Sequence, residues 1–253
     1  SDTGKVIMAE AAKTMKKLSL ELGGKSASII FEDANLNKAL PFAISSIFTN
    51  AGQLCTSASR LLVQESVAEQ VIKELKQRAE NLKVGNGLED STDMGAITIE
   101  SQMNSILDYI EIGKRDGKIL TGGIRLTEGE LGRGFFVAPT IITDLPCQSP
   151  AVQEEIFGPV LTLQTFKEED EAIEMANGTA FGLASGVWSQ NIDRAMRVAR
   201  KMRAGTAWIN TYNRLLNECE TGGYKESGIG RSGGAEGLLK FTEVKHICID
   251  FSS

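Results

Sequence analysis

The chain has 253 residues, of which 42% are hydrophobic and 24% charged, so it can form a folded core and is not disordered along its length. Its 27 basic and 33 acidic residues give a net charge of −6, which argues against a nucleic-acid partner. No apolar run reaches the roughly 18 residues that a membrane-spanning helix requires, so we expect no membrane partner either.

Helical and extended patterns alternate along the first half of the chain. The patterns predict helices over 5–17, 36–50, 66–82 and around 103–110, and strands over 18–22, 27–31, 61–64 and 118–120. Ser66 and Glu69 have the spacing of a capping box, which predicts that the third helix begins at Ser66.

The second half continues the alternation, which is typical of an α/β domain. Strands are predicted over 135–142, 160–166, 183–188 and 206–210, and helices over 168–177 and 193–202, with Met196 among the inward-facing residues. The glycine-rich residues 211–237 predict a long loop with little regular structure, and residues 244–251 predict a C-terminal strand.

Cysteine and histidine usage argues against a metal centre. The four cysteines, at 55, 147, 219 and 248, form no Cys-x-x-Cys pair, and His246 is the single histidine, so we predict no metal site. A Ser-His-Asp triad would require His246, which lies in the predicted C-terminal strand, where a lone histidine is usually structural. Few, widely spaced cysteines are typical of a reduced, intracellular protein, and we expect a cytoplasmic location.

Residues 228–233, Gly-Ile-Gly-Arg-Ser-Gly, match the dinucleotide-binding pattern G-x-G-x-x-G. The authentic motif follows a strand and opens a helix early in a βαβ unit, whereas this one follows a predicted loop near the end of the chain. We therefore interpret the segment as a turn-rich loop.

Two residues have surroundings that suggest chemistry. A cysteine is most often a small buried apolar residue, but Cys55 lies in the polar bend Asn50-Ala-Gly-Gln-Leu-Cys55, whose free N–H groups are suited to holding an oxyanion. Glu21 interrupts an apolar run before Gly23-Gly24, so it is either a capped structural carboxylate or, if partly desolvated, a general base for water.

Four segments, taken together and in this order, resemble motifs of the aldehyde dehydrogenase superfamily. They are Leu20-Glu-Leu-Gly-Gly-Lys-Ser26, Gly52-Gln-Leu-Cys55, Glu154-Glu-Ile-Phe-Gly-Pro-Val160 and Gly222-Gly-Tyr-Lys-Glu-Ser-Gly-Ile-Gly-Arg231. The fourth also accounts for the glycine cluster better than a dinucleotide-binding turn does.

The resemblance implies roles for individual residues. The matching cysteine, Cys55, is the nucleophile, and the matching glutamate, Glu21, is the general base. Glu155 holds the nicotinamide ribose with Phe157 nearby, the carbonyl of Leu22 meets the nicotinamide amide, and Ser1 belongs to the loop that enters the helix facing the cofactor pyrophosphate. The implied reaction oxidises an aldehyde to a carboxylic acid through a thiohemiacetal and a thioester, with NAD or NADP as cofactor.

The implied fold is a three-layer α/β catalytic domain with a mainly parallel sheet. Residues 1–24 would be the last helix and strand of a dinucleotide-binding domain, 25–220 the catalytic domain, and 221–253 a returning loop with an oligomerisation strand. Family members are roughly twice as long, so we expect a fragment that is inactive alone, with an apolar face where the other half belongs. The family also implies a homodimer or homotetramer for the full-length protein.

The chain departs from the family in the loop that faces the substrate, where Leu215, Glu218 and Cys219 lie. Its carboxylates, at 218 and 220, would favour a cationic aldehyde if they face the substrate, and otherwise form a solvated loop edge. Ser232 and Gly233 follow Arg231 where relatives often carry an acidic residue.

Two other functions are compatible with the same residues. Cys55 and Glu21 would also serve a cofactor-free thiol hydrolase or acyl-transferase, because thioester chemistry needs no nicotinamide. The chain could instead be a non-catalytic, truncated subunit with an oligomerising or regulatory role.

Overall fold

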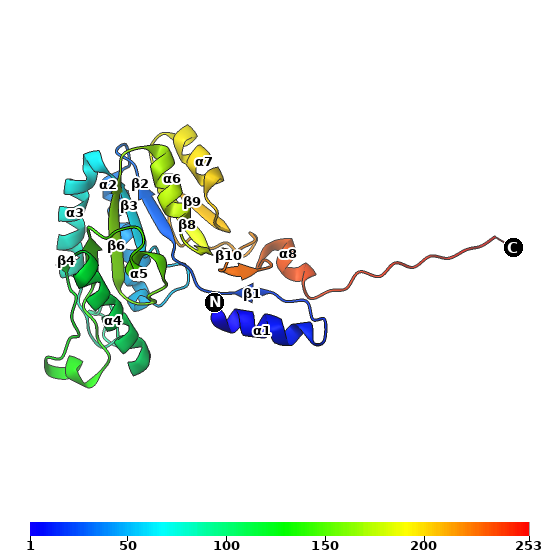
Figure 1. Ribbon diagram of the computed structural model, residues 1–253, viewed down its shortest axis with the longest axis horizontal. Helices are drawn as coiled ribbons and strands as arrows, with labels where there is room; N and C mark the ends of the chain where they lie inside the picture. The colour runs from blue at the N-terminus through cyan, green and yellow to red at the C-terminus, as the bar shows by residue number, and fades with distance from the viewer. Residues whose placement is uncertain (253) are drawn as a thin grey trace.

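The computed structural model describes residues 1–252 and places a seven-stranded sheet at its centre (Figure 1). The strand order is β4-β5-β6-β3-β2-β8-β9. All neighbouring pairs are parallel except β4 and β5, so the expectation of a mainly parallel sheet is confirmed. The strands are β2 (Ala27–Ile30), β3 (Arg60–Gln64), β4 (Lys118–Thr121), β5 (Thr140–Thr143), β6 (Val160–Phe166), β8 (Ala184–Trp188) and β9 (Thr206–Ile209).

The central strands are covered on both faces. All four residues of β2 are buried, as are the first four of β3 and all five of β8. Continuous apolar runs of this kind are typical of a parallel sheet with helices on either side.

Two helical layers supply that cover and complete the three-layer architecture (Figure 1). On one face, α2 (Leu36–Phe48), α3 (Glu65–Glu80), α4 (Glu100–Asp116) and the short α5 (Pro150–Gln153) pack around the larger core, which includes Leu40, Leu75 and Ile106. On the other face, α6 (Glu169–Asn177) and α7 (Ile192–Lys201) pack around a second core that includes Ile29, Phe166 and Val198.

The N-terminal segment and the glycine-rich segment lie outside this sheet and pair with each other. Strand β1 (Leu20–Glu21) is antiparallel to β11 (Gly228–Ile229), and β7 (Phe181–Gly182) is antiparallel to β10 (Tyr224–Lys225). Figure 1 shows α1 (Asp2–Ala12) and α8 (Gly234–Leu239) beside these short strand pairs. The prediction of an irregular loop over 211–237 was therefore partly wrong, because strands of two residues are defined by distant partners and have no periodicity of their own.

Three smaller predictions were also wrong. Helix α3 begins at Glu65 without a side-chain cap, and the hydroxyl of Ser66 donates instead to Glu32, at 3.1 Å. Regular pairing of the strand predicted over 135–142 is confined to Thr140–Thr143. Met196, expected to face inward, is 40% exposed because it lies on the outer side of α7.

Residues 244–251 form no strand within this single chain. They are exposed and extend away from the body of the molecule (Figure 1). The predicted C-terminal strand is thus not formed here, since an extended segment becomes a strand only when another segment pairs with it.

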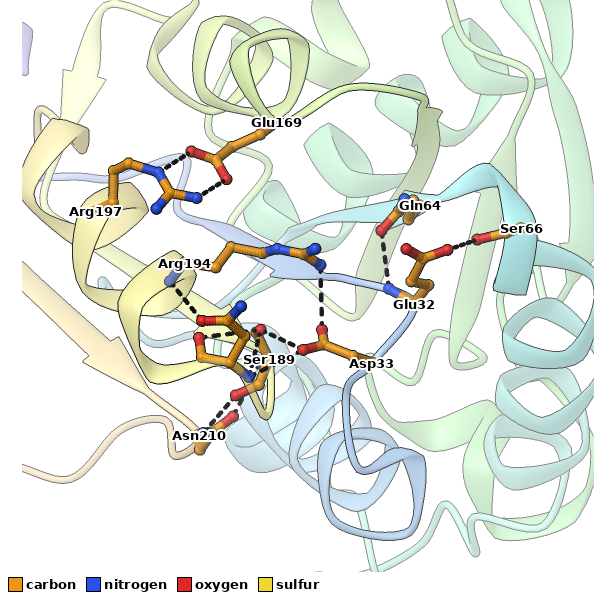
Figure 2. A network of polar contacts seen from close by, with 10 residues as sticks. Glu32, Asp33, Gln64, Ser66, Glu169, Ser189, Arg194, Arg197 and Asn210 are labelled. Atoms are coloured by element: carbon orange, nitrogen blue, oxygen red, sulfur yellow. Dashed lines mark hydrogen bonds and ion pairs between the residues drawn. The ribbon is translucent and has the colours of Figure 1, made fainter.

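The carboxyl ends of the strands carry a polar network, shown in Figure 2. Asp33, after β2, accepts hydrogen bonds from the Ser189 hydroxyl at 2.8 Å and the Asn191 N–H at 2.9 Å, and pairs with Arg194 at 3.4 Å. Asn210, after β9, donates to the carbonyl of Ser189. These groups satisfy one another, so this edge of the sheet holds α7 in place.

Within residues 1–252, no helix is long and apolar enough to cross a membrane.

Candidate active site

The residues expected to carry chemistry meet at the amino-terminal edge of the sheet. Three loops lead into parallel neighbouring strands: 22–26 into β2, 53–59 into β3, and 154–159 into β6. Because the strands are parallel, the loops before them lie at one edge, opposite the network of Figure 2. The fold thus brings Leu22, Cys55 and Glu155 together from positions up to 133 residues apart in the printed sequence.

The Cys55 loop is the glycine-containing bend that the sequence predicts. After α2, a 3-10 turn spans Thr49–Gly52, in which Asn50 and Ala51 both have φ of 54°. The Asn50 side chain donates to the carbonyl of Gln53 at 3.0 Å and stabilises this conformation. At Gly52, with φ of +73°, a Cβ atom would overlap the carbonyl of Gly158, so glycine is required for the two loops to meet.

Cys55 is exposed and lies within the field of two carboxylates. Desolvation of the sulfur is the main cause that raises the pKa of its thiol above the ordinary value, and the negative charges of Glu155 and Glu21 raise it further. Backbone N–H groups of Thr56 and of Cys55 itself act in the opposite direction. The thiol therefore faces N–H donors that suit an oxyanion, as expected from the sequence.

Glu155 is held against the Gly23-Gly24 turn. The N–H of Gly24 donates to Oε1 of Glu155 at 2.9 Å, and a Cβ atom at Gly23 would overlap the other carboxylate oxygen. Burial raises the pKa of the Glu155 carboxyl, while the Gly24 N–H and the positive charge of Lys25 lower it.

Phe157, Leu22 and Ser1, the other residues expected at the cofactor site, each have separate structural surroundings. Phe157 has φ of 54° and is 38% exposed. Leu22 donates its N–H to the carbonyl of Ser227 at 3.0 Å and packs against the start of α1 at Gly4. The hydroxyl of Ser1 donates to the carbonyl of Glu226 at 2.9 Å.

Glu21 is exposed, so the partial desolvation considered for it is not present in this chain. Its position in β1 lies opposite Gly228 of β11, and the hydroxyl of Ser232 donates to its Oε1 at 3.1 Å. The carboxylate is thus held by the glycine-rich segment and has no apolar enclosure within residues 1–252.

A cavity of about 300 Å³ adjoins the Cys55 loop on the other side. Leu54 and Thr56, which flank Cys55, line it together with Leu215 and the two aromatic residues Phe42 and Tyr212. The Tyr212 hydroxyl donates to the carbonyl of Thr56 at 3.0 Å and ties the substrate loop to the Cys55 loop.

Of the predicted substrate-loop residues, only Leu215 lines this cavity; Glu218 and Cys219 do not. Glu220 accepts a hydrogen bond from the Ala235 N–H at 3.2 Å and is thereby engaged with α8. These positions favour the interpretation of the two carboxylates as a solvated loop edge.

Lys25 and Arg60 were not singled out from the sequence, although both lie directly beneath the site. Lys25 is 2% exposed, and its Nζ has no hydrogen-bond partner within residues 1–252. Burial, with the nearby Arg60 charge, lowers the pKa of Lys25 to about 7. Arg60 donates to the carbonyls of Lys25, Met175 and Ala176 at 2.6–2.9 Å. A lysine directly before the buried run 26–30 was the available signal for this burial.

Two features around Glu155 fit the ribose of a nicotinamide nucleotide. Glu155 presents a carboxylate of which, within residues 1–252, only Oε1 is hydrogen-bonded, and a carboxylate oxygen readily accepts from a ribose hydroxyl. Gly23 keeps the adjoining space free of a side chain. Across the same described residues, no group of three or more His, Cys, Asp or Glu side chains is arranged to hold a metal ion.

Comparisons with known proteins agree with this arrangement. The sequence model of a protein family, described as "Aldehyde dehydrogenase family", matches residues 1–247. A betaine aldehyde dehydrogenase of Bacillus subtilis (strain 168) is 45% identical over 247 residues, which cover 97% of this chain and 50% of the relative. One from Vibrio vulnificus (strain YJ016) is 42% identical over 254 residues, covering 100% and 52%.

Solved structures show the same likeness. A betaine aldehyde dehydrogenase point mutant from Staphylococcus aureus, in complex with NAD+, superposes with a TM-score of 0.95 at 42% identity, covering 97% of this chain and 50% of that one. An aldehyde dehydrogenase of Bacillus cereus, also in complex with NAD+, gives 0.95 at 44% identity, covering 99% and 50%. The chain spans about half the length of the curated relatives that it matches. By its sequence and its fold, the chain belongs to the aldehyde dehydrogenase family.

Proposed function

We propose that residues 1–253 form the thiol-bearing part of an NAD(P)-dependent aldehyde dehydrogenase, which oxidises an aldehyde to a carboxylic acid. The observation that carries the proposal is the meeting of three loops at one edge of the sheet: the Cys55 loop contacts the Glu155 loop where Gly52 meets Gly158, and it contacts the Gly23-Gly24 turn at the carbonyl of Cys55. The names of the relatives and the NAD+ complexes of the structural neighbours support the same reaction.

In this proposal Glu155, Phe157 and Leu22 hold the nicotinamide end of NAD or NADP, and Ser1 lies in the loop that enters the helix facing the cofactor pyrophosphate. When bound, the nucleotide supplies the hydride acceptor for the oxidation. Glu155 fits this role because Gly24 fixes one carboxylate oxygen and leaves the other available to a ribose hydroxyl. Leu22 fits because the contact of its N–H with Ser227 fixes the peptide next to Glu21.

Cys55 and Glu21 carry the covalent steps. The Cys55 thiolate adds to the aldehyde carbon, and the N–H groups beside the sulfur stabilise the negative oxygen of the thiohemiacetal. After oxidation the acyl group remains on Cys55 as a thioester. Glu21 takes a proton from water, the water oxygen attacks the thioester carbon, and the carbon–sulfur bond breaks to release the acid and the thiolate.

The substrate we propose is a small aldehyde that reaches Cys55 through the cavity lined by Leu54, Thr56 and Leu215. Betaine aldehyde is the first to test, because it names the relatives. The cavity lining includes no acidic side chain, and Glu218 and Glu220 lie outside it. Glu218→Gln should therefore leave any preference between cationic and neutral aldehydes unchanged.

The same proposal includes the wider organisation. Residues 1–24 end a dinucleotide-binding domain, 25–220 form the catalytic domain, and 221–253 return along it to an oligomerisation segment. The complete protein would be a homodimer or homotetramer. A cytoplasmic location remains our prediction, supported by four cysteines that are all free thiols within residues 1–252.

The test compares residues 1–253 with a complete polypeptide in which they follow a dinucleotide-binding half of the usual family length. The complete protein should reduce NAD or NADP in the presence of an aldehyde, Cys55→Ala should abolish this, and residues 1–253 alone should be inactive. Ester hydrolysis that depends on Cys55 but never on a nucleotide would instead indicate a thiol hydrolase. A complete protein without either activity would indicate a non-catalytic subunit.

A further inference from the structure

We propose that Ser232 and Lys240 are positioning residues for Glu21, which hold its carboxylate in place for the hydrolysis of the thioester. The inference rests on the proposed function, since it assigns Glu21 the role of base. It concerns the segment that directly follows Arg231, the last residue of the fourth motif.

A short chain of hydrogen bonds carries the proposal. The Ser232 hydroxyl donates to Oε1 of Glu21 at 3.1 Å. The Lys240 ammonium donates to the Ser232 hydroxyl oxygen at 3.1 Å and to the hydroxyl of Ser19 at 3.1 Å. Lys240 therefore fixes Ser232 directly. Through Ser19 it also fixes the start of β1, the strand that carries Glu21.

The donor and acceptor chemistry gives this series of hydrogen bonds a single direction. An ammonium group can only donate, and an ionised carboxylate can only accept. Ser232 must therefore accept from Lys240 and direct its one O–H at Glu21. Within residues 1–252 this is the only hydrogen bond to the Glu21 carboxylate, so Oε2 stays available to take the proton of the attacking water.

The backbone brings Ser232 to this position with little freedom. Thr221 and Ser232 exchange two backbone hydrogen bonds, both at 2.7 Å, and close the base of the segment. Within the segment, Gly228 pairs with Glu21, and Gly230, with φ of +82°, lies so close to Ser19 that a Cβ atom would be 2.9 Å from its hydroxyl. Both contacts require glycine, so the segment approaches β1 as closely as backbone sterics allow.

The expected consequence concerns one step of the reaction. A carboxylate without the Ser232 bond samples more orientations, and fewer of these align Oε2 with the water. Loss of a single hydrogen bond of ordinary strength corresponds to a decrease of about three- to tenfold. Formation of the acyl-enzyme, which does not use Glu21, should be unaffected.

The experiment isolates that step in the complete enzyme that contains residues 1–253. Cys55 is acylated with p-nitrophenyl acetate, and the decay of the acetyl-enzyme is followed by intact mass. Ser232→Ala should slow the decay about three- to tenfold without changing the rate of acylation. Ser232→Thr, which retains a hydroxyl, should restore the decay, and Lys240→Met should slow it in the same direction. Lys245→Met, which changes an exposed lysine without a hydrogen bond, is the matched control.

Glu21→Gln separates the two ways in which this result can fail. If Glu21→Gln slows the decay and Ser232→Ala does not, the positioning role is wrong while the base assignment stands. If Glu21→Gln has no effect, or no acetyl group forms on Cys55, the proposed function fails at its own step. The inference is also contradicted if Ser232→Ala slows the decay of the acetyl-enzyme, Ser232→Thr does not restore its rate, and thermal unfolding is unchanged.

Discussion

The Cys55 thiol lies in the charge field of two carboxylates, which add to the effect of desolvation on the pH at which it reacts. Only the thiolate reacts with iodoacetamide, so alkylation increases as the pH passes the thiol pKa. Desolvation and the charges of Glu155 and Glu21 raise that pKa.

Glu155→Gln removes one of these negative charges and should lower the pKa of the Cys55 thiol. The alkylation profile of Cys55 in residues 1–253 should consequently shift to lower pH. Peptide mass spectrometry separates Cys55 from Cys147, Cys219 and Cys248, which are also exposed. Glu218→Gln, which neutralises an exposed carboxylate outside the site, is the control; a shift of equal size in both variants would contradict the prediction.

Lys25 is the second residue whose titration should be visible. Its pKa is lowered to about 7 in the folded chain, below the ordinary lysine value that applies after unfolding. Between these two values the unfolded chain binds the additional proton, so the contribution of Lys25 to stability increases with pH from about 7 toward the unfolded value.

Lys25→Met should remove that dependence. The free energy of unfolding in urea, measured from pH 7 to 10, should rise less with pH in Lys25→Met than in the unchanged chain. Lys73→Met on the exposed face of α3 provides the comparison. Parallel curves for the unchanged chain and Lys25→Met would mean that Lys25 titrates normally.

At the level of elements, the site depends on two loops whose backbones lie so close together that the contact leaves no room for a side chain. Gly52 follows α2 and Gly158 precedes β6, and the two meet backbone to backbone. This contact joins the Cys55 loop to the loop of Glu155. A side chain at Gly52 would have to displace a carbonyl group, and φ of +73° adds backbone strain.

Gly52→Ala should destabilise the chain by about 1–3 kcal/mol and separate the two loops. Chemical denaturation measures the first effect, and a changed rate of Cys55 alkylation reports the second. Gly87→Ala is the matched control, because a Cβ atom at Gly87 would meet nothing within 4 Å. Equal stability of the two variants would show that the loop contact can relax.

At the scale of the whole molecule, apolar side chains remain exposed on the elements outside the sheet. Val6, Ile7 and Met8 of α1 are 43–63% exposed, and Leu238 and Leu239 of α8 are 58–70% exposed. The C-terminal segment adds four more: Val244, Ile247, Ile249 and Phe251. An apolar face where the other half of the protein belongs stays a prediction, which these exposed side chains support, and exposed apolar surface promotes association.

Polar substitution of Val244, Ile247, Ile249 and Phe251 to serine should reduce self-association of residues 1–253. The segment makes no contact with either hydrophobic core, so the midpoint of thermal unfolding should stay the same. Sedimentation velocity measures the first quantity and circular dichroism the second. The control replaces four exposed polar residues between 86 and 93 by serine. If the C-terminal substitutions leave self-association unchanged, the association would be assigned to α1 or α8.

The sequence by itself determined the parts whose signals are local. The segments 27–31 and 160–166 predicted two central strands, because short stretches rich in apolar residues between turns are visible without a partner. Helix α7 was predicted from its 3.6-residue period, a signal that is likewise visible without a partner segment. The motif order identified the family, since each motif is a short contiguous string, and it predicted Cys55, Glu21 and Glu155 as site residues.

Only the tertiary structure decided which distant groups meet. The Ser232–Glu21 hydrogen bond joins residues 211 positions apart, and the Ser66 hydroxyl caps no helix because it donates its hydrogen bond to Glu32, from another loop. Within residues 1–252, Lys25 became a buried amine without a hydrogen-bond partner only when β2 took its place inside the sheet, and residues 244–251 pair with no described strand. Periodicity and composition report how a segment behaves alone, whereas these contacts depend on the three-dimensional arrangement of the whole chain.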